Sequence, residues 1–152
     1  MKISLKAVIC GVALVAMGSL AFAGFAKPED AIRYRQAVMT VIGQHFGLIA
    51  AVVKGQSPYS KDEVERNAAV LRTMSELSWE AVMMPGSDKG DTTLSDRAMK
   101  EPDKFMVAAQ QFESAVQKLE QSAKSGDLEA VKAQFGEVAK SCKACHSTYR
   151  KN

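Results

Sequence analysis

Apolar residues recur every three or four positions along four long segments of the chain, with polar residues between them. This spacing places the apolar side chains on one face of an α-helix. No segment alternates between apolar and polar residues with the two-residue period of a β-strand. The pattern therefore predicts an all-α fold.

The first two helices are predicted from their end signals and their apolar stripes. One helix begins near Pro28, which suits a first helical turn, and ends near Lys54. Ser60 and Glu63 form a capping-box pattern that starts a second helix, and the Pro-Gly pair at 85–86 ends it. The inward residues expected are Ile32, Met39, Ile42, Phe46, Ile49 and Val53 in the first helix and Val64, Ala68, Leu71, Met74, Leu77 and Val82 in the second.

Two further helices are predicted after a polar stretch at 86–100, which favours a loop with at most a short helical turn at 94–99. The third helix begins near Pro102 and is capped at Gly126, and Asp127 caps the fourth. Short links join the first pair and the last pair, which is typical of an antiparallel four-helix bundle. The inward residues expected are Phe105, Ala108, Ala109, Phe112, Val116 and Leu119 in the third helix and Leu128, Val131, Phe135, Val138, Cys142, Cys145 and Tyr149 in the fourth.

The first 23 residues have the composition of a secretory signal peptide. Lys2 and Lys6 precede an apolar run at 7–17, and the small residues Ala21 and Ala23 mark a cleavage site. The run is shorter than the ~20 residues needed to span a bilayer. We therefore expect a cleaved signal at 1–23, one bundle domain at 24–152, a periplasmic location and no membrane attachment after cleavage.

The net charge argues against a nucleic-acid partner. Loss of the two signal lysines lowers the formal charge from +3 to +1, so the basic balance owes much to the signal. No cluster of Lys and Arg in the rest of the chain resembles a nucleic-acid footprint.

The cysteines carry the strongest chemical signal. Cys10 leaves with the signal peptide, and Cys142 and Cys145 form the pattern C-x-x-C-H with His146, which is typical of c-type haem attachment. Two thiols one helical turn apart can each add to a vinyl group of one haem, and the adjacent imidazole can bind its iron. The motif predicts one covalently attached haem c, with His146 as an axial ligand of the iron.

Other uses of the cysteine pair fit the sequence less well. A structural zinc site needs about four ligands, and outside the motif only His45 and ordinary carboxylates are available. A thioredoxin-like redox pair normally lies beside a βαβ pattern, which the chain lacks. A disulfide between residues three apart on a helix would close a small, strained ring.

The chain resembles the class II cytochromes c, and most closely the cytochromes c′. The resemblance lies in KPEDAIRYRQ at 27–36, VKGQSPY at 53–59, and SCKACH at 141–146 followed by Tyr149 and Arg150. Class I cytochromes c carry the haem motif near their start, whereas here it lies near the C-terminus. The resemblance implies the same bundle that the apolar pattern predicts.

The resemblance also implies two candidate functions, which differ in what lies opposite His146. In cytochromes c′ a bulky apolar side chain covers the iron without binding it, and the five-coordinate iron takes up small gases. In the related low-spin proteins a methionine of the first helix binds the iron, and the protein carries electrons. Met39 on the inward stripe suits either function, whereas His45 is rotated roughly 120° from it and is expected at the surface or boundary.

The match to cytochrome c′ favours binding of nitric oxide and carbon monoxide, with electron transfer to a partner that the sequence does not identify. By the same resemblance, Arg35 and Gln36 are expected at the haem propionates and Arg150 beside the proximal face. Trp79, the only tryptophan, is expected in the core near the haem edge. An enzyme is not expected, because the predicted distal wall (Ile32, Met39, Ile42, Phe46) offers no polar group for proton transfer.

A homodimer is expected through the first two helices. The first helix carries more small and apolar residues than one inward stripe needs, which suggests a second packing surface. The resemblance implies the same, because the family commonly dimerises through this element. The surplus residues are Ala31, Ala37, Val38, Val41, Ala51 and Val52.

Overall fold

The computed structural model describes residues 24–151, so the predicted signal at 1–23 lies outside the described residues. The described part of the chain folds into α1 (Pro28–Val53), α2 (Lys61–Met74), α3 (Trp79–Met83), α4 (Arg97–Lys100), α5 (Pro102–Ser125) and α6 (Leu128–Tyr149). The predicted all-α, antiparallel four-helix bundle is confirmed. Its long helices are α1, α2, α5 and α6.

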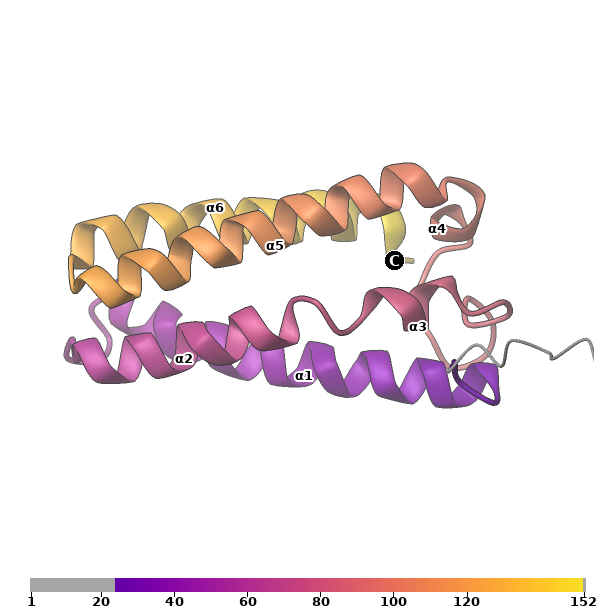
Figure 1. Cartoon of the computed structure of the whole chain (residues 1–152), viewed down its shortest axis with the longest axis horizontal. Coiled ribbons are helices and arrows are strands. Elements are labelled where there is room, and N and C mark those ends of the chain that lie inside the picture. Colours follow the sequence, from indigo (N-terminus) through magenta and orange to yellow (C-terminus); the bar gives the residue numbers. More distant parts are fainter. Residues whose placement is uncertain (1–23, 152) are drawn as a thin grey trace, which may run out of the picture.

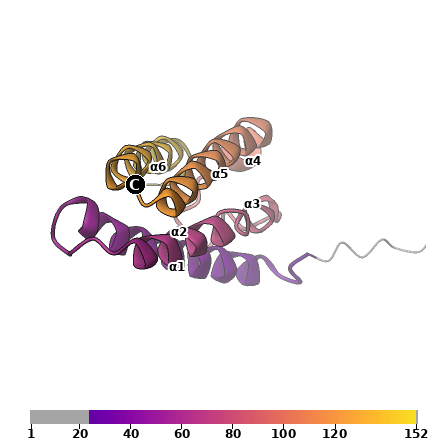
Figure 2. The ribbon, with the colours of Figure 1, turned by 60° about the vertical axis from the view of Figure 1, so that its left-hand side comes forward.

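The long helices pack as two pairs. α1 packs mainly on α2 and α5 mainly on α6, and α2 also contacts α5 across the bundle. Figure 1 shows the α5–α6 pair above the α1–α2 pair, and the two pairs form separate layers in Figure 2 as well. The C-terminus lies at the end of the bundle that carries α3 and α4.

The apolar stripes meet in two core clusters. The larger cluster takes residues from all four long helices, including the fully buried Ile49, Leu71, Leu119 and Val131. The smaller cluster closes the end of the bundle at α3 and α4, and contains Val82, Leu94, Ala98, Phe105, Ala109 and Tyr149. The clusters together account for most of the inward residues that the sequence predicts.

Capping contacts confirm the predicted starts of α2 and α6 and the predicted end of α5. The Ser60 side chain accepts a hydrogen bond from the Glu63 amide, at 3.5 Å. Asp127 Oδ1 accepts hydrogen bonds from the amides of Glu129 and Ala130, at 2.9 and 3.2 Å. Gly126 has a φ of 77°, the left-handed geometry that suits glycine after a helix.

The prediction of one continuous second helix up to Pro85-Gly86 is wrong, because residues 75–78 separate α2 from α3. Ser75 is fully buried, and its hydroxyl donates a hydrogen bond to the Arg72 carbonyl at 2.8 Å. A serine hydroxyl that bonds to a nearby carbonyl competes with the helical backbone. Leu77, expected in the core, is 38% exposed in this break.

The predicted surplus of apolar residues on α1 is partly wrong. Ala31, Val38 and Val52 are buried in the core of the bundle and leave no second surface. Ala37 and Val41 of the predicted set are exposed, as are Tyr34 and Leu48; the larger residues Tyr34, Val41 and Leu48 have exposed fractions of 37%, 36% and 45%. Their seven-residue spacing places them on one face of α1.

The segment between α3 and α4, which the sequence leaves without a definite shape, packs on the C-terminus. Leu94 and Arg150 form an isolated antiparallel β-bridge. The Ser95 amide donates to the Tyr149 carbonyl at 2.8 Å, and the Lys151 amide donates to the Thr93 carbonyl at 2.7 Å. These hydrogen bonds hold the segment against the end of α6.

Candidate functional site

The cysteine pair lies on the inward side of α6, near its end. Cys142 packs against the larger core cluster and Cys145 against the smaller one, and both thiols are free and half-buried. Burial raises the pKa of both thiols, and the neighbouring Cys142 adds to the rise at Cys145. The pair therefore presents two neutral thiols one helical turn apart.

A cavity of about 380 Å³ lies next to Cys145. α1, α3, α5, the end of α6 and the segment before α4 all contribute to its wall. The residues that line it are Arg35, Gln36, Met39, Thr40, Trp79, Val82, Thr92, Thr93, Leu94, Phe105, Cys145, His146, Tyr149 and Arg150. The cavity brings together every predicted site residue except Cys142, which lies one turn before Cys145 on the same helix.

His146 lines this cavity with its side chain largely exposed. Partial burial lowers the pKa of the imidazole, and the positive charge of Arg150 lowers it further. Both effects favour the neutral imidazole, which is the form that binds metal ions.

Arg35 lies on α1 and is only 7% exposed. Its Nη1 donates to the Ala81 carbonyl at 3.1 Å and to Ser87 Oγ at 3.3 Å. Its Nη2 donates to the Ser87 carbonyl at 2.9 Å and to Thr92 Oγ1 at 2.7 Å. These four hydrogen bonds use all the terminal N–H groups and leave only the Nε–H. Burial lowers the pKa of the guanidinium, since no carboxylate accepts these bonds.

These contacts limit the predicted role of Arg35 at the haem propionates. Its terminal donors hold the end of α3 and the following segment, so what it offers the cavity is mainly its positive charge. Gln36 is exposed and its amide donates to the Asp91 carbonyl at 3.0 Å. The propionate contacts of both residues stay predictions.

The predicted distal wall is largely wrong. Met39 lines the cavity and is half-buried, but Ile32 and Ile42 are buried elsewhere in the bundle. Phe46 stacks on Phe135 in the larger core cluster, with ring centroids 4.2 Å apart. A helical stripe is wider than the part of it that faces the cavity, so only one of its side chains reaches the cavity.

Trp79 begins α3 and forms part of the cavity wall. Its ring meets Phe105 and Phe112 edge to face, at centroid distances of 5.9 and 6.2 Å. Its indole N–H donates to Glu113 Oε1 at 2.5 Å, which ties α3 to α5. The apolar spacing of α5 gives no sign of this polar contact.

His45 lies away from the cavity. Its Nδ1 is 2.7 Å from Asn67 Oδ1, a contact that links α1 to α2. Among residues 24–151, no three His, Cys, Asp or Glu side chains gather as ligands for a metal ion, so the zinc alternative has no ligand set there.

The groups around the cavity fit one haem. Two guanidinium groups, from Arg35 and Arg150, line it, and none of its lining residues is acidic. Positive charge without a competing carboxylate suits a ring that carries two carboxylates. The thiols and the neutral imidazole of His146 supply the groups that attach such a ring and bind its iron.

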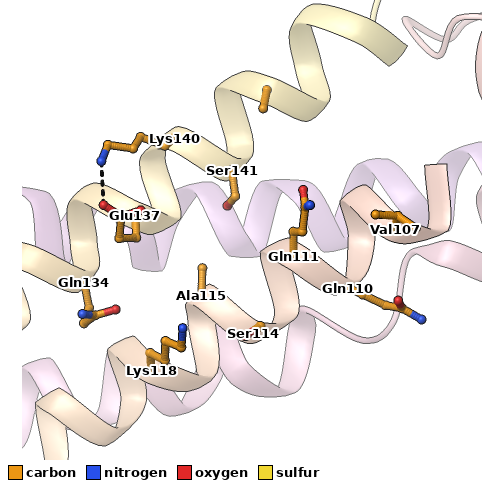
Figure 3. Close-up of a pocket in the computed structure, with 11 residues that line it drawn as sticks. Val107, Gln110, Gln111, Ser114, Ala115, Lys118, Gln134, Glu137, Lys140 and Ser141 are labelled. Atoms are coloured by element: carbon orange, nitrogen blue, oxygen red, sulfur yellow. Dashed lines mark hydrogen bonds and ion pairs between the residues drawn. The ribbon is translucent and has the colours of Figure 1, made fainter. Parts of the chain in front are cut away.

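A second hollow, of about 580 Å³, lies on the outer side of the bundle between α5 and α6. Figure 3 shows amide, hydroxyl and charged side chains around it, including Gln111, Gln134 and Lys118. It contains none of the predicted site residues.

Comparisons with known proteins point to one family. The family model described as Cytochrome C′ matches residues 30–150. The cytochrome c′ of Alcaligenes xylosoxydans xylosoxydans is 45% identical over 130 residues, covering 84% of this chain and 98% of that protein. The cytochrome c′ of Rubrivivax gelatinosus is 39% identical over 127 residues, covering 83% and 98%.

Solved structures give the same result. The nitric oxide complex of a leucine-to-alanine variant of the Alcaligenes xylosoxidans cytochrome c′ superposes with a TM-score of 0.78 at 43% identity, covering 84% of this chain and 98% of that one. A carbon monoxide complex of another variant has the same TM-score of 0.78. The Rubrivivax gelatinosus structure has a TM-score of 0.80 at 38% identity, covering 84% and 99%.

Proposed function

Because the chain belongs to the cytochrome c′ family and carries one covalently attached haem c, we propose that it binds nitric oxide and carbon monoxide in the periplasm. When bound, the haem would supply an iron that can take up one small ligand. Support comes from the relatives that form complexes with these gases. The signal pattern at 1–23 supports export.

Three residues of α6 hold the haem in this proposal. Cys142 and Cys145 attach it from the inward face of the helix, and His146 binds the iron. Partial burial and, to a smaller degree, the charge of Arg150 disfavour the protonated form of His146, which keeps the imidazole free to act as a ligand.

The observation that carries the proposal is the α1 wall of the cavity. Met39 is the apolar group on this wall, and the polar groups beside it already form hydrogen bonds within the chain. Thr40 Oγ1 donates to the Gln36 carbonyl at 2.9 Å, and the Gln36 and Arg35 donors bond to backbone and hydroxyl oxygens of the segment 81–92. A neutral diatomic gas has no charge to desolvate when it enters beside Met39.

The same wall argues against turnover. General acid–base catalysis needs a side chain placed to give or take a proton at the reacting group. Thr40 and Gln36 are bonded within the chain, and Met39 has no proton to exchange. We therefore propose a binding protein and not an enzyme.

The alternative function is an electron carrier. Met39 places a thioether on the wall of the same cavity as His146, and a thioether can serve as an axial ligand. We place gas binding first because the chain matches the cytochromes c′ along its whole bundle.

Titration of the reduced protein with nitric oxide tests the proposal. We expect one equivalent of nitric oxide to saturate the protein and to give the paramagnetic resonance signal of a ferrous nitrosyl. A protein that takes up no nitric oxide under anaerobic conditions would rule the function out. Cell fractionation of an expressing bacterium tests the periplasmic location separately.

We also propose that the protein is a homodimer. The exposed face of α1 formed by Tyr34, Val41 and Leu48 offers an apolar surface to a second copy. The small residues Ala37 and Gly47 lie on the exposed side of the same helix, where no side chain obstructs a close approach between two helices.

A further inference from the structure

The cavity is closed on one side by the segment before α4. Thr92, Thr93 and Leu94 line the cavity, and this segment is held from two directions. From α1, Arg35 donates to Thr92 and to Ser87. From the C-terminus, residues 149–151 bond to 93–95.

The Thr92 hydroxyl lies where these two supports meet. Its Oγ1 accepts a hydrogen bond from Arg35 Nη2 at 2.7 Å and another from the Leu94 amide at 3.1 Å. Leu94 forms the β-bridge with Arg150. A path of hydrogen bonds therefore runs from α1, which carries Met39, to Arg150, which follows the helix of His146.

Arg150 is the residue at the end of this path that acts on the site. Its side chain is exposed and lines the cavity together with His146, which lies one helical turn before it. Its backbone is held by the Leu94 bridge and by its own amide, which donates to the His146 carbonyl at 3.1 Å. We call residues 93–95, which carry this bridge, the Leu94 strand. Movement of the Leu94 strand would therefore move Arg150.

We propose that Thr92 is a positioning residue whose hydroxyl, held by Arg35, fixes the Leu94 strand and so keeps Arg150 beside His146. The role deepens the proposed function, because it sets the environment of the iron-binding histidine from the opposite helix. The neighbouring Thr93 makes no such link, since its side chain is exposed and only its backbone carbonyl bonds to Lys151.

Lys151 gives the segment a support that does not depend on the Thr92 hydroxyl. Its Nζ donates to the Asp88 carbonyl at 2.8 Å, and its amide donates to the Thr93 carbonyl at 2.7 Å. Loss of the hydroxyl should therefore loosen the strand without detaching it. The variant protein should still fold and hold its haem.

The test compares three variants of the haem-loaded protein. Thr92→Val removes the hydroxyl at nearly constant shape, Thr92→Ser restores it, and Thr93→Val makes the same change one residue away. The first readout is amide hydrogen exchange at Leu94, Ser95 and Arg150, which reports the strand whatever the iron binds. The second is the resonance Raman band of the iron–histidine bond in the ferrous protein.

We expect Thr92→Val to speed exchange at these amides by about tenfold or more and to shift the iron–histidine band. Thr92→Ser should restore both, and Thr93→Val should change neither. Equal exchange in Thr92→Val and Thr93→Val would overturn the proposal, and so would faster exchange with an unmoved band. A low-spin wild-type protein without the band would instead refute the five-coordinate function, and exchange at Arg150 would then decide the role of Thr92.

Discussion

Replacing Met39 with alanine should raise the affinity for carbon monoxide and lower the stability of the fold by similar free energies. Truncation of a fully buried methionine costs about 2–5 kcal/mol. Met39 is half-buried and packs on the larger core cluster, so we expect a cost of about 1–2 kcal/mol. This lowers Tm by roughly 3–8 °C in a domain of this size.

The gain in affinity has the same physical origin. A gas that binds beside Met39 has to displace the packing contacts of this side chain, so removing them returns about 1–2 kcal/mol to binding. That free energy corresponds to a roughly 5- to 30-fold higher affinity. Carbon monoxide titration followed by absorbance measures the affinity, and thermal unfolding measures the stability.

Met74→Ala is the matched control for this variant. Met74 is half-buried and packs on the same core cluster, but it does not line the cavity. It should lose stability to a similar degree without any gain in carbon monoxide affinity. Equal affinity in Met39→Ala and the wild type would refute the view that Met39 crowds the iron. Conversion of a low-spin wild type to a high-spin variant would show that Met39 is a ligand.

Three other predictions test attachment, assembly and acid stability. The haem should stay on the chain through acid–acetone extraction, as measured by mass spectrometry. It should also stay when Cys142 or Cys145 alone is replaced by serine, because the other cysteine still attaches it. Release of the haem from the wild type would contradict covalent attachment. Leu48→Glu should turn the dimer into a monomer, as measured by sedimentation. Val107→Glu on α5 is the control, because Val107 is 53% exposed, and it should leave the dimer intact. A monomeric wild type at micromolar concentration would contradict the interface. Lys89 donates a hydrogen bond to Asp88 at 2.8 Å, which lowers the pKa of the Asp88 carboxyl. The charged carboxylate therefore stabilises the fold at any pH above the ordinary pKa of aspartate. This stabilisation is lost as the pH falls through the lowered pKa. Asp88→Asn should therefore flatten the acid limb of the unfolding free energy, and identical limbs in both proteins would contradict this role.

The long helices could be predicted from the sequence because their causes are local. Ser60 and Asp127 start α2 and α6 through hydrogen bonds to amides two or three residues away. The inward stripes follow the helical period, which is a property of the backbone alone. These start signals and stripes can be recognised without knowing any distant residue.

The arrangement of α3 and of the segment that follows it depends on distant residues and could not be predicted. Arg35 holds Ala81, Ser87 and Thr92 across 46 to 57 positions in the chain. A pattern of polar residues shows that such a segment avoids regular structure, but not which donor it bonds to. Its contact with Tyr149 and the residues after it is likewise tertiary.

Some residues of the candidate site could be predicted from the sequence and others could not. The motif at 142–146 predicts the cysteines and the histidine because the chemistry needs them in sequence. Met39 could be predicted from its stripe, but the same stripe also suggested Ile32 and Ile42, which the bundle buries elsewhere. The contact of Arg35 with a haem propionate stays a prediction, and the hydrogen bonds that its terminal donors form within the chain gave no signal in the sequence.

The optical spectrum of the reduced protein, recorded before and after addition of carbon monoxide, tests the five-coordinate site most directly. With Met39 covering the iron and not binding it, the ferrous protein should be high-spin before the addition, and one equivalent of carbon monoxide should convert it to a low-spin complex. A ferrous spectrum that is already low-spin, carries a methionine-ligand signature and does not respond to carbon monoxide would contradict gas binding and establish the electron carrier in its place.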